Sequence, residues 1–581
     1  MNIKLSLFLF LISVVSFAQN PNYKTNAQKM DQLLNHINIM YLDTVNFDAL
    51  IEKGVIEMLK ELDPHSAYIS KKDVQQANEP LIGSFDGIGI SFEIVKDTIN
   101  ITEVIINGPS EKVGILARDK ILRVDTATAY GKHLNNKWVF DHLRGPKGTK
   151  VNLLIKRGKN TEPLEFTIIR DKIPMNSINV YFMADKNTGY IRLERFAQNS
   201  TLELRDAITR LKARGMKNLI FDLRGNSGGY LQAAFDIANE FIGDNKMIVY
   251  TDNFRKTGES FKSNSRGDFQ KGRLIILVDE GSASASEIVS GSVQDWDRGI
   301  IMGRRTFGKG LVQKPIYLND GAQVRLTISK YYTPSGRCIQ RPYEDGLDNY
   351  LNEFNNRRNH GELITADSIK FPDSLKYHTA KGRTVYGGGG IMPDIFIPFD
   401  TTRYSSLYFE MLRKGIISSF ALDYFDFNKE LLKSQYPTVE EYKNNFLISD
   451  EFLQELIDYA HKEGIKDSVT FIFSKRAELF IKEKSAVLDS LYNSLEDFTG
   501  SESFQKMFTE YITDSFNESM RLRNINKANE LLKDALRFNI ARYLFGYNEA
   551  YQIHLTTDEG FLKAIEVINN DKVFKKFKVD Y

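Results

Sequence analysis

Residues 274–290 read Leu-Ile-Ile-Leu-Val-Asp-Glu-Gly-Ser-Ala-Ser-Ala-Ser-Glu-Ile-Val-Ser, and this stretch decides the fold of the chain around it. The apolar run 274–278 predicts a buried β-strand. The small residues that follow predict a tight turn, and a helix is expected from Ser284 to Trp296. A strand that leads into a helix through a short turn is the repeating unit of an α/β sheet.

The same unit recurs on both sides of this stretch. Strands are expected at 190–193, 219–222, 300–302 and 324–329, and helices at 202–212 and 231–241. Such alternation implies crossover connections and a largely parallel or mixed sheet. We therefore predict one α/β domain over residues 175–400.

The chain outside this domain divides into parts of different character. Residues 19–82 show apolar spacings of three and four that predict helices, and residues 83–174 predict a small β-rich module with one or two helices. Residues 401–581 again show helical spacing, most clearly at 479–495 and 528–544. We predict a multidomain α+β protein.

The first residues have the pattern of an export signal. Lys4 precedes the apolar run 5–17, and Ser16-Phe17-Ala18 resembles a cleavage site, so residues 1–18 are predicted to be a signal peptide. The run is shorter than the ~20 residues that span a bilayer, which disfavours the alternative of an uncleaved anchor. The protein is expected to be secreted across the inner membrane, and a periplasmic location would follow in a Gram-negative host.

The composition excludes some classes of protein. The 77 basic and 75 acidic residues nearly cancel, so charge provides no argument for binding nucleic acid or an anionic membrane. The 8 histidines are scattered and form no zinc-binding phrase, so we expect no metal and no cofactor.

Three short phrases in the α/β region could carry chemistry. Residues 222–229 read Asp-Leu-Arg-Gly-Asn-Ser-Gly-Gly, and their glycines let backbone N–H groups turn outward, as an oxyanion hole requires. A plain strand-to-helix turn is the alternative. Ser284 begins a helix, where the exposed N–H groups stabilise negative charge, but Ser284 with Glu287 also fits an ordinary capping box.

The third phrase is Thr306-Phe307-Gly308-Lys309-Gly310-Leu311-Val312-Gln313. An exposed turn lysine is the ordinary interpretation. However, a lysine amine can act as a base when burial favours its neutral form, and its ordinary pKa is about 10.4. The apolar neighbours Phe307, Leu311 and Val312 are candidates for the walls of such a site.

Together the three phrases resemble the active site of the C-terminal processing (tail-specific) serine peptidases. Ser284 and Lys309 lie 25 residues apart, and Gln313 lies four beyond the lysine, as in that family. The resemblance covers about 27–400 and implies a crotonase-like (Clp-like) α/β core. It implies Ser284 as nucleophile, Lys309 as general base and Gln313 as its orienting partner. It further implies an oxyanion hole made by the N–H groups of Ala285 and of Gly228 or Gly229.

By the same resemblance, residues 83–174 are similar to a PDZ domain, which binds the C-terminal tail of a protein as an added strand. The tail-binding residues would be Gly87, Ile88, Gly89, Ile90 and Phe92. Arg144 would couple tail binding to activation, and its alternative is a surface-turn charge. The expected partners are protein substrates with free C-terminal tails, with an adaptor protein and a homo-oligomer left open.

Two other functions compete with this interpretation. The phrase 225–229 also resembles the nucleophile phrase of trypsin-type PDZ stress proteases, which would make Ser227 the nucleophile. The nearest upstream histidines, His133 and His142, lie inside the PDZ-like module, which disfavours that triad. A non-catalytic PDZ adaptor is the second alternative, although Ser284, Lys309 and Gln313 would then have no role.

Overall fold

The computed structural model describes residues 22–158, 162–400, 405–465 and 528–581. The predicted signal peptide and the helix expected at 479–495 lie outside these residues. The chain forms two compact units: residues 1–72 with 315–326, and residues 73–314 with 327–581. Within the described residues, no helix combines the length and the apolar composition that crossing a bilayer requires.

In its described residues, the first unit holds two helices, the short strand β1 and parts of two further strands within 315–326. Helices α1 (Tyr23–Met40) and α2 (Phe47–Lys60) confirm the predicted helical region. The side chain of Asn46 caps α2 by accepting a hydrogen bond from the N–H of Ala49. Strand β1 (Ala67–Ile69) pairs antiparallel with residues 323–325, a contact between segments too far apart in the sequence for local patterning to predict.

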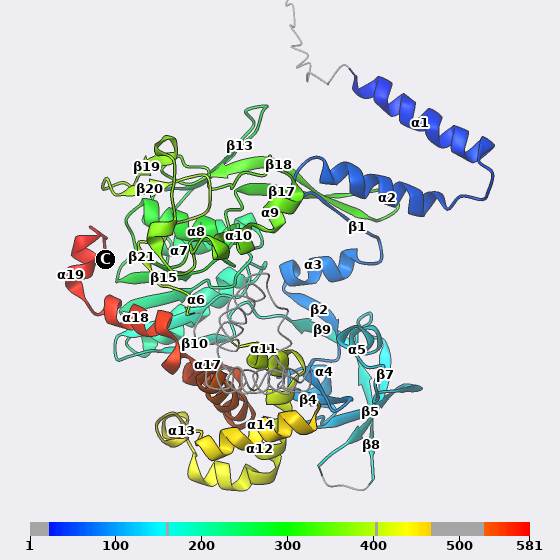
Figure 1. The fold of residues 1–581 in the computed structure, drawn as a ribbon, viewed down its shortest axis with the longest axis vertical. Helices are drawn as coiled ribbons and strands as arrows, with labels where there is room; N and C mark the ends of the chain where they lie inside the picture. The colour runs from blue at the N-terminus through cyan, green and yellow to red at the C-terminus, as the bar shows by residue number, and fades with distance from the viewer. Residues whose placement is uncertain (1–21, 159–161, 401–404, 466–527) are drawn as a thin grey trace, which may run out of the picture. The chain divides into compact units, whose positions relative to one another are not determined.

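The second unit begins with helix α3 (Val74–Ile82) and a β-rich module (Figure 1). Its main sheet has the order β3 (Ile90–Val95), β4 (Thr98–Val104), β5 (Lys120–Val124), β7 (Lys150–Lys156) and β8 (Leu164–Ile169), with β6 (Ala127–Thr128) paired to β5. Strand β2 (Ser84–Gly87) pairs with β9 (Asp171–Pro174). Helices α4 (Pro109–Lys112) and α5 (Asn136–Leu143) complete the module. The predicted β-rich module is confirmed.

The α/β region holds a sheet of six strands. Their order is β10 (Val180–Met183), β11 (Thr188–Arg192), β12 (Asn218–Asp222), β15 (Leu274–Val278), β16 (Ile300–Gly303) and β21 (Ile395–Phe396). Only the β10–β11 pair is antiparallel. The predicted mixed sheet is therefore confirmed, and strand β15 has the bounds that its apolar run indicated.

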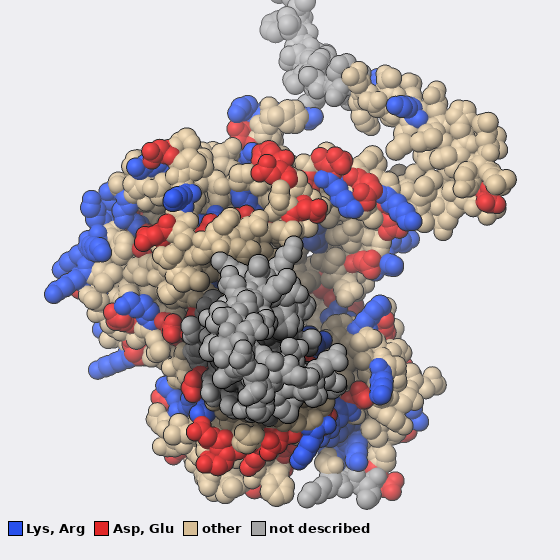
Figure 2. Space-filling view, viewed as in Figure 1, with Lys and Arg blue, Asp and Glu red and all other residues tan. Residues whose placement is uncertain are grey.

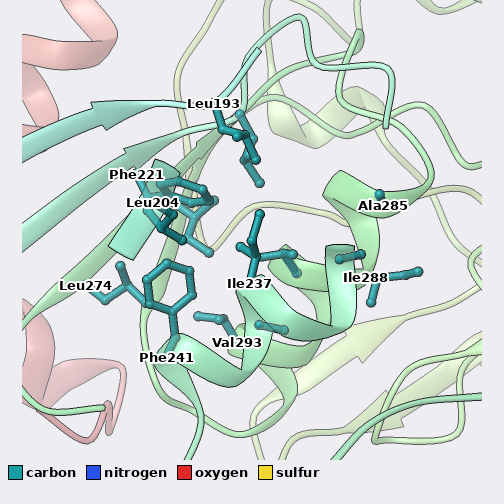
Figure 3. Close-up of a cluster of buried hydrophobic side chains, with 14 of the residues drawn as sticks. Leu193, Leu204, Phe221, Ile237, Phe241, Leu274, Ala285, Ile288 and Val293 are labelled. Atoms are coloured by element: carbon teal, nitrogen blue, oxygen red, sulfur yellow. The ribbon is translucent and has the colours of Figure 1, made fainter. Parts of the chain in front are cut away.

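Alternate residues of these strands face two different apolar layers. On one face, Leu274 and Ile276 of β15 pack with helices α6 (Ser200–Ala213), α7 (Leu231–Phe241) and α8 (Ala285–Asp295). Figure 3 shows Ile237 of α7 and Val293 of α8 within this layer. Every residue of α8 is buried, so this helix is a fixed support for whatever its N-terminus carries.

The opposite face of the sheet is covered by the C-terminal helices α17 (Tyr547–His554), α18 (Glu559–Ile568) and α19 (Asp571–Lys576). Ile275 and Leu277 of β15 pack there with Phe561 of α18 and Phe574 of α19. Residues 547–581 therefore share a core with the α/β sheet, and Figure 1 draws these helices in orange to red.

A separate helical cluster precedes them. Helices α11 (Ser406–Arg413), α12 (Ile416–Gln435), α13 (Val439–Asn445) and α14 (Asp450–Lys462) share an apolar core with the helix at 528–545, which confirms the helix expected at 528–544. The strand expected at 324–329 is β18 (Gln323–Tyr332), but it lies outside the six-stranded sheet, because it pairs with β17 (Leu311–Tyr317) and β13 (Met247–Asp252) instead. The remaining elements are β14 (Ser260–Lys262), which pairs with β13, and the short β19 (Lys376–His378), β20 (Thr384–Tyr386), α9 (Leu347–Leu351) and α10 (Glu353–Asn359).

A buried ion pair fixes the far end of α8. The carboxylate of Asp295 accepts a hydrogen bond of 2.7 Å from Arg337, and both side chains are inaccessible to solvent. Asp295 also accepts one from the N–H of Ser335.

The surface carries charges of both signs. On the face visible in Figure 2, acidic and basic side chains are interspersed, in keeping with the nearly balanced charge.

Candidate active site

Ser284 stands between strand β15 and helix α8, at the first position before the helix. Its backbone has φ 54° and ψ −110°, a conformation that costs a non-glycine residue about 1–3 kcal/mol. Its N–H donates to Glu287 over 2.8 Å, and its carbonyl accepts from the hydroxyl of Tyr331 over 3.0 Å. Hydrogen bonds to its N–H and to its carbonyl thus stabilise the strained backbone of Ser284.

One buried carboxylate connects the serine to the lysine phrase. Glu287 Oε2 accepts hydrogen bonds from the N–H groups of Ser284 (2.8 Å) and Lys309 (2.9 Å). Its Oε1 accepts from the N–H of Gly308 (2.7 Å) and the hydroxyl of Thr306 (2.5 Å). Burial raises the pKa of Glu287, while these four donors oppose that rise. The carboxylate fixes the two backbone segments relative to each other.

The structure brings Lys309 and Gln313 together. The Nζ of Lys309 donates a 2.9 Å hydrogen bond to Gln313 Oε1. Gln313 lies near the start of β17, and Leu311 before it is buried. A Cβ on Gly310 would lie 2.7 Å from the N–H nitrogen of Gln340, so a glycine is required next to the lysine.

The loop after β12 approaches the same helix end. Gly228 has φ +101°, and a Cβ there would lie 2.9 Å from Ser284 Cβ and 3.0 Å from the nitrogen of Ala285. A Cβ on Gly229 would lie 2.1 Å from the carbonyl oxygen of Phe196. Gly228 is therefore needed for this loop to contact the serine turn, and Gly229 for it to pass close to Phe196.

Gly228 and Gly229 differ in the hydrogen bonding of their backbone N–H groups. Gly228 is buried, and its N–H donates to the side chain of Asn226 over 2.9 Å. Gly229 is exposed. In the part of the chain that the structure describes, no hydrogen bond uses the N–H of Gly229 or of Ala285. Of the two candidate glycines, Gly229 thus has the N–H group that is not already hydrogen-bonded within the described residues.

Replacing Gly228 with alanine should lower kcat by about 100-fold, the effect of losing one oxyanion donor, because the new Cβ must displace Ser284 or the Ala285 N–H. Gly225→Ala is the matched control. Gly225 also has positive φ (+70°), but a Cβ there meets nothing within 4 Å. Steady-state kinetics should show less than about a fivefold loss for Gly225→Ala, since its small cost is backbone strain alone. Equal losses of kcat in the two variants would contradict the close approach of Gly228 to Ser284 and Ala285.

The predicted tail-binding residues lie at an open sheet edge. Gly87 ends β2, Ile88 and Gly89 form the connection, and Ile90 begins β3. Among the described strands of this sheet, β3 pairs with β4 alone, so its other edge can accept a peptide strand. Phe92 of β3 contacts Phe140 of α5 edge to face, with ring centroids 5.8 Å apart.

Arg144 is more than a surface-turn charge. Its guanidinium forms an ion pair with Glu79 of α3 and lies over the rings of Phe85 (4.6 Å) and Phe140 (4.5 Å). Burial raises the pKa of Glu79, and the charge of Arg144 opposes that effect. Arg144 therefore links helix α3 to Phe85 of β2 and to Phe140 of α5.

The residues of the trypsin-type alternative do not come together. His133 and His142 both contact the ring of Trp138 inside the β-rich module. In the described residues, no hydrogen bond joins a histidine to Ser227.

Sequence reasoning missed two acidic residues near the site. Glu287 was noted only as half of a capping box, and the spacing of three from Ser284 was the available signal. Asp558, which binds the arginine of the 222–229 loop, belongs to the C-terminal segment and had no signal in the sequence.

Comparison with known proteins identifies the parts of this architecture. The model of peptidase family S41 matches residues 187–347, the PDZ domain model matches 87–168, and a family of unknown function, DUF8443, matches 407–480. The β-rich module is therefore a PDZ domain, and Ser284 and Lys309 lie within the peptidase match, together with the four central strands β11, β12, β15 and β16 of the α/β sheet.

Two curated relatives that match 57–58% of this chain agree with the peptidase match. The chain is 33% identical over 341 residues to the carboxy-terminal-processing protease of Bartonella bacilliformis and covers 77% of that protein. It is 34% identical over 331 residues to a probable CtpA-like serine protease of Staphylococcus epidermidis, of which it spans 66%, just under two thirds. A solved photosystem II D1 C-terminal processing protease is 22% identical, with 65% of this chain and 89% of that chain covered and a TM-score of 0.34. The chain belongs to peptidase family S41.

Proposed function

We propose that this protein is a serine endopeptidase that uses a Ser284–Lys309 dyad to cleave proteins selected by their C-terminal tails. The observation that carries the proposal is the carboxylate of Glu287, which binds the backbone of Ser284 and of Lys309 at once. A non-catalytic adaptor would have no use for such a connection. Membership in a peptidase family supports the same activity.

The proposed first step is acylation. Neutral Lys309 takes the proton of the Ser284 hydroxyl as the oxygen attacks the substrate carbonyl carbon. The negative oxygen that develops is bound by the N–H groups of Ala285 and Gly229, at the positive end of the fully buried helix α8. Lys309, now protonated, gives its proton to the leaving amine, and the peptide bond breaks.

Deacylation repeats these roles with water. Lys309 removes a proton from water, hydroxide attacks the acyl-serine ester, and the proton returns to Ser284 when the ester bond breaks. Gln313 accepts one N–H of the lysine amine, which fixes the direction of the nitrogen lone pair. A base must be oriented in this way before proton transfer is efficient.

The proposed substrates are proteins outside the cytoplasm with a free, apolar C-terminal tail. The tail would add a strand to β3 and place its carboxylate at the connection between Gly87 and Ile90, with Phe92 lining the pocket. The signal-like residues 1–18 support secretion, and a Gram-negative host would make the location periplasmic. No cofactor takes part in these steps.

Tail-dependent cleavage tests this proposal. The wild-type protein should cut an unfolded test protein that ends in an apolar tail at least about tenfold faster than the same protein with an amidated tail, because the amide removes the carboxylate that the PDZ domain binds. Gel analysis of fragments measures both rates. Equal rates would contradict tail selection, and no cleavage of either protein would contradict the proposed activity.

A further inference from the structure

An arginine in the loop after β12 is bound by the C-terminal helices. Arg224 Nη1 donates two hydrogen bonds of 2.9 Å to the carboxylate of Asp558. The Nε and Nη2 of the same guanidinium bind Asp222, the last residue of β12. Asp222 is fully buried and also accepts from the hydroxyl of Tyr190 over 2.6 Å. The arginine is thus held between the sheet and the C-terminal segment.

Asp558 is placed by helix α18. It is the N-cap of that helix and accepts a hydrogen bond of 2.6 Å from the N–H of Phe561. A Cβ on Gly560 would lie 3.0 Å from Arg224 Nη1, so the first turn of α18 rests directly against the guanidinium. The helix is itself fixed, because Phe561 packs in the apolar layer beneath the sheet.

The loop that Arg224 begins leads to Gly228 and Gly229. The N–H of Gly225 donates to Asp279 over 2.8 Å, and the carbonyl of Asn226 accepts from the N–H of Ala283 over 3.0 Å. The side chain of Asn226 then binds the N–H of Gly228. The backbone that follows Arg224 is therefore fixed by hydrogen bonds at Gly225, Asn226 and Gly228, up to its approach to Ser284.

We propose that Asp558 is a positioning residue for catalysis: through Arg224 it holds the 224–229 loop at the distance from Ser284 that the oxyanion hole requires. This inference rests on the proposed function. The ion pair suits the role because both side chains are about four-fifths buried (18% and 21% exposed), where charge pairing is strong and direction is well defined. Asp558 lies outside the residues that the three family models match.

The test compares two acidic residues of the same C-terminal segment. Asp558→Asn keeps the size of the side chain and an N-cap acceptor for Phe561, but removes the charge that binds Arg224. The matched control is Asp571→Asn. Asp571 makes a similar ion pair of 2.8 Å with Arg273, which precedes β15 at the end of that strand opposite to Ser284.

For Asp558→Asn we expect kcat to fall about tenfold with KM within about twofold, since a loop displaced by a fraction of an ångström binds the transition state less well but the tail equally. Asp571→Asn should retain kcat. Hydrogen exchange should be faster at residues 225–229 in the first variant only, and thermal unfolding should show that both variants are folded.

The inference is overturned if the two variants have the same kcat and the same exchange at 225–229, or if Asp558→Asn changes KM alone. The exchange measurement does not depend on activity. An inactive wild-type protein would contradict the proposed function, and unchanged exchange would separately contradict the role of Asp558.

Discussion

Ser284→Ala and Lys309→Met should each lower kcat by about 1,000-fold or more, because each removes one of the two groups between which the proton moves. Alanine has no oxygen to attack the carbonyl, and methionine fills the space of the lysine side chain without a basic nitrogen. The double variant should be no slower than either single variant, since residues that act as a unit are not additive in their effects. Fragment release from a tailed test protein, fitted for kcat and KM, measures all three.

Ser227→Ala is the control for this experiment. Ser227 is exposed in the loop next to Gly228 and Gly229, and its side chain is the nucleophile of the trypsin-type alternative. We expect its loss to reduce kcat by less than about tenfold, the range of small positional effects in a loop. Full activity of Ser284→Ala together with an inactive Ser227→Ala would reverse the assignment.

Glu287→Gln should both destabilise the protein and slow it. A glutamine offers one carbonyl oxygen, so two of the four donors now bound by Glu287 must face its NH₂ group. Buried donors without acceptors cost about 1–3 kcal/mol each, so the free energy of unfolding should fall by about 3 kcal/mol. Because the carboxylate also sets the position of Lys309 relative to Ser284, kcat should fall about 100-fold.

Urea unfolding and steady-state kinetics measure these two effects. Glu280→Gln is the matched control, since Glu280 lies in the connection between β15 and α8 and, among the described residues, forms its ion pair with the side chain of Arg304. Its loss should cost about 1 kcal/mol and leave kcat within about threefold. If Glu287→Gln unfolds as wild type does and keeps its kcat, the carboxylate does not connect the two segments.

Much of the fold could be predicted because it is encoded locally. The strand at 274–278 is an unbroken apolar run between turns, and the helix at 231–241 has its apolar residues on one face, so each has the predicted bounds. Strand β1 could not be predicted, because three residues become a strand only when residues 323–325 lie beside them. The packing of α18 beneath the sheet was also unpredictable, since an amphipathic pattern does not say which surface will cover it.

The candidate site could also be predicted from the sequence only in part. Ser284, Lys309 and Gln313 stand out in short phrases of unusual composition, and the structure brings the lysine and glutamine within hydrogen-bond distance. The sequence left Gly228 and Gly229 equivalent. Only the fold distinguishes them, by burying one N–H against Asn226 and leaving the other exposed.

Because residues 547–581 cover the second face of the sheet, they determine when during synthesis this sheet can complete its folding. The strands of the sheet are synthesised before the C-terminal helices. The apolar face that carries Ile275 and Leu277 therefore stays exposed to water until Phe561 and Phe574 have also been synthesised. A partly made sheet with such a face is prone to aggregate and suited to chaperone binding. The sheet can therefore bury both of its faces only after residues 547–581 have been synthesised.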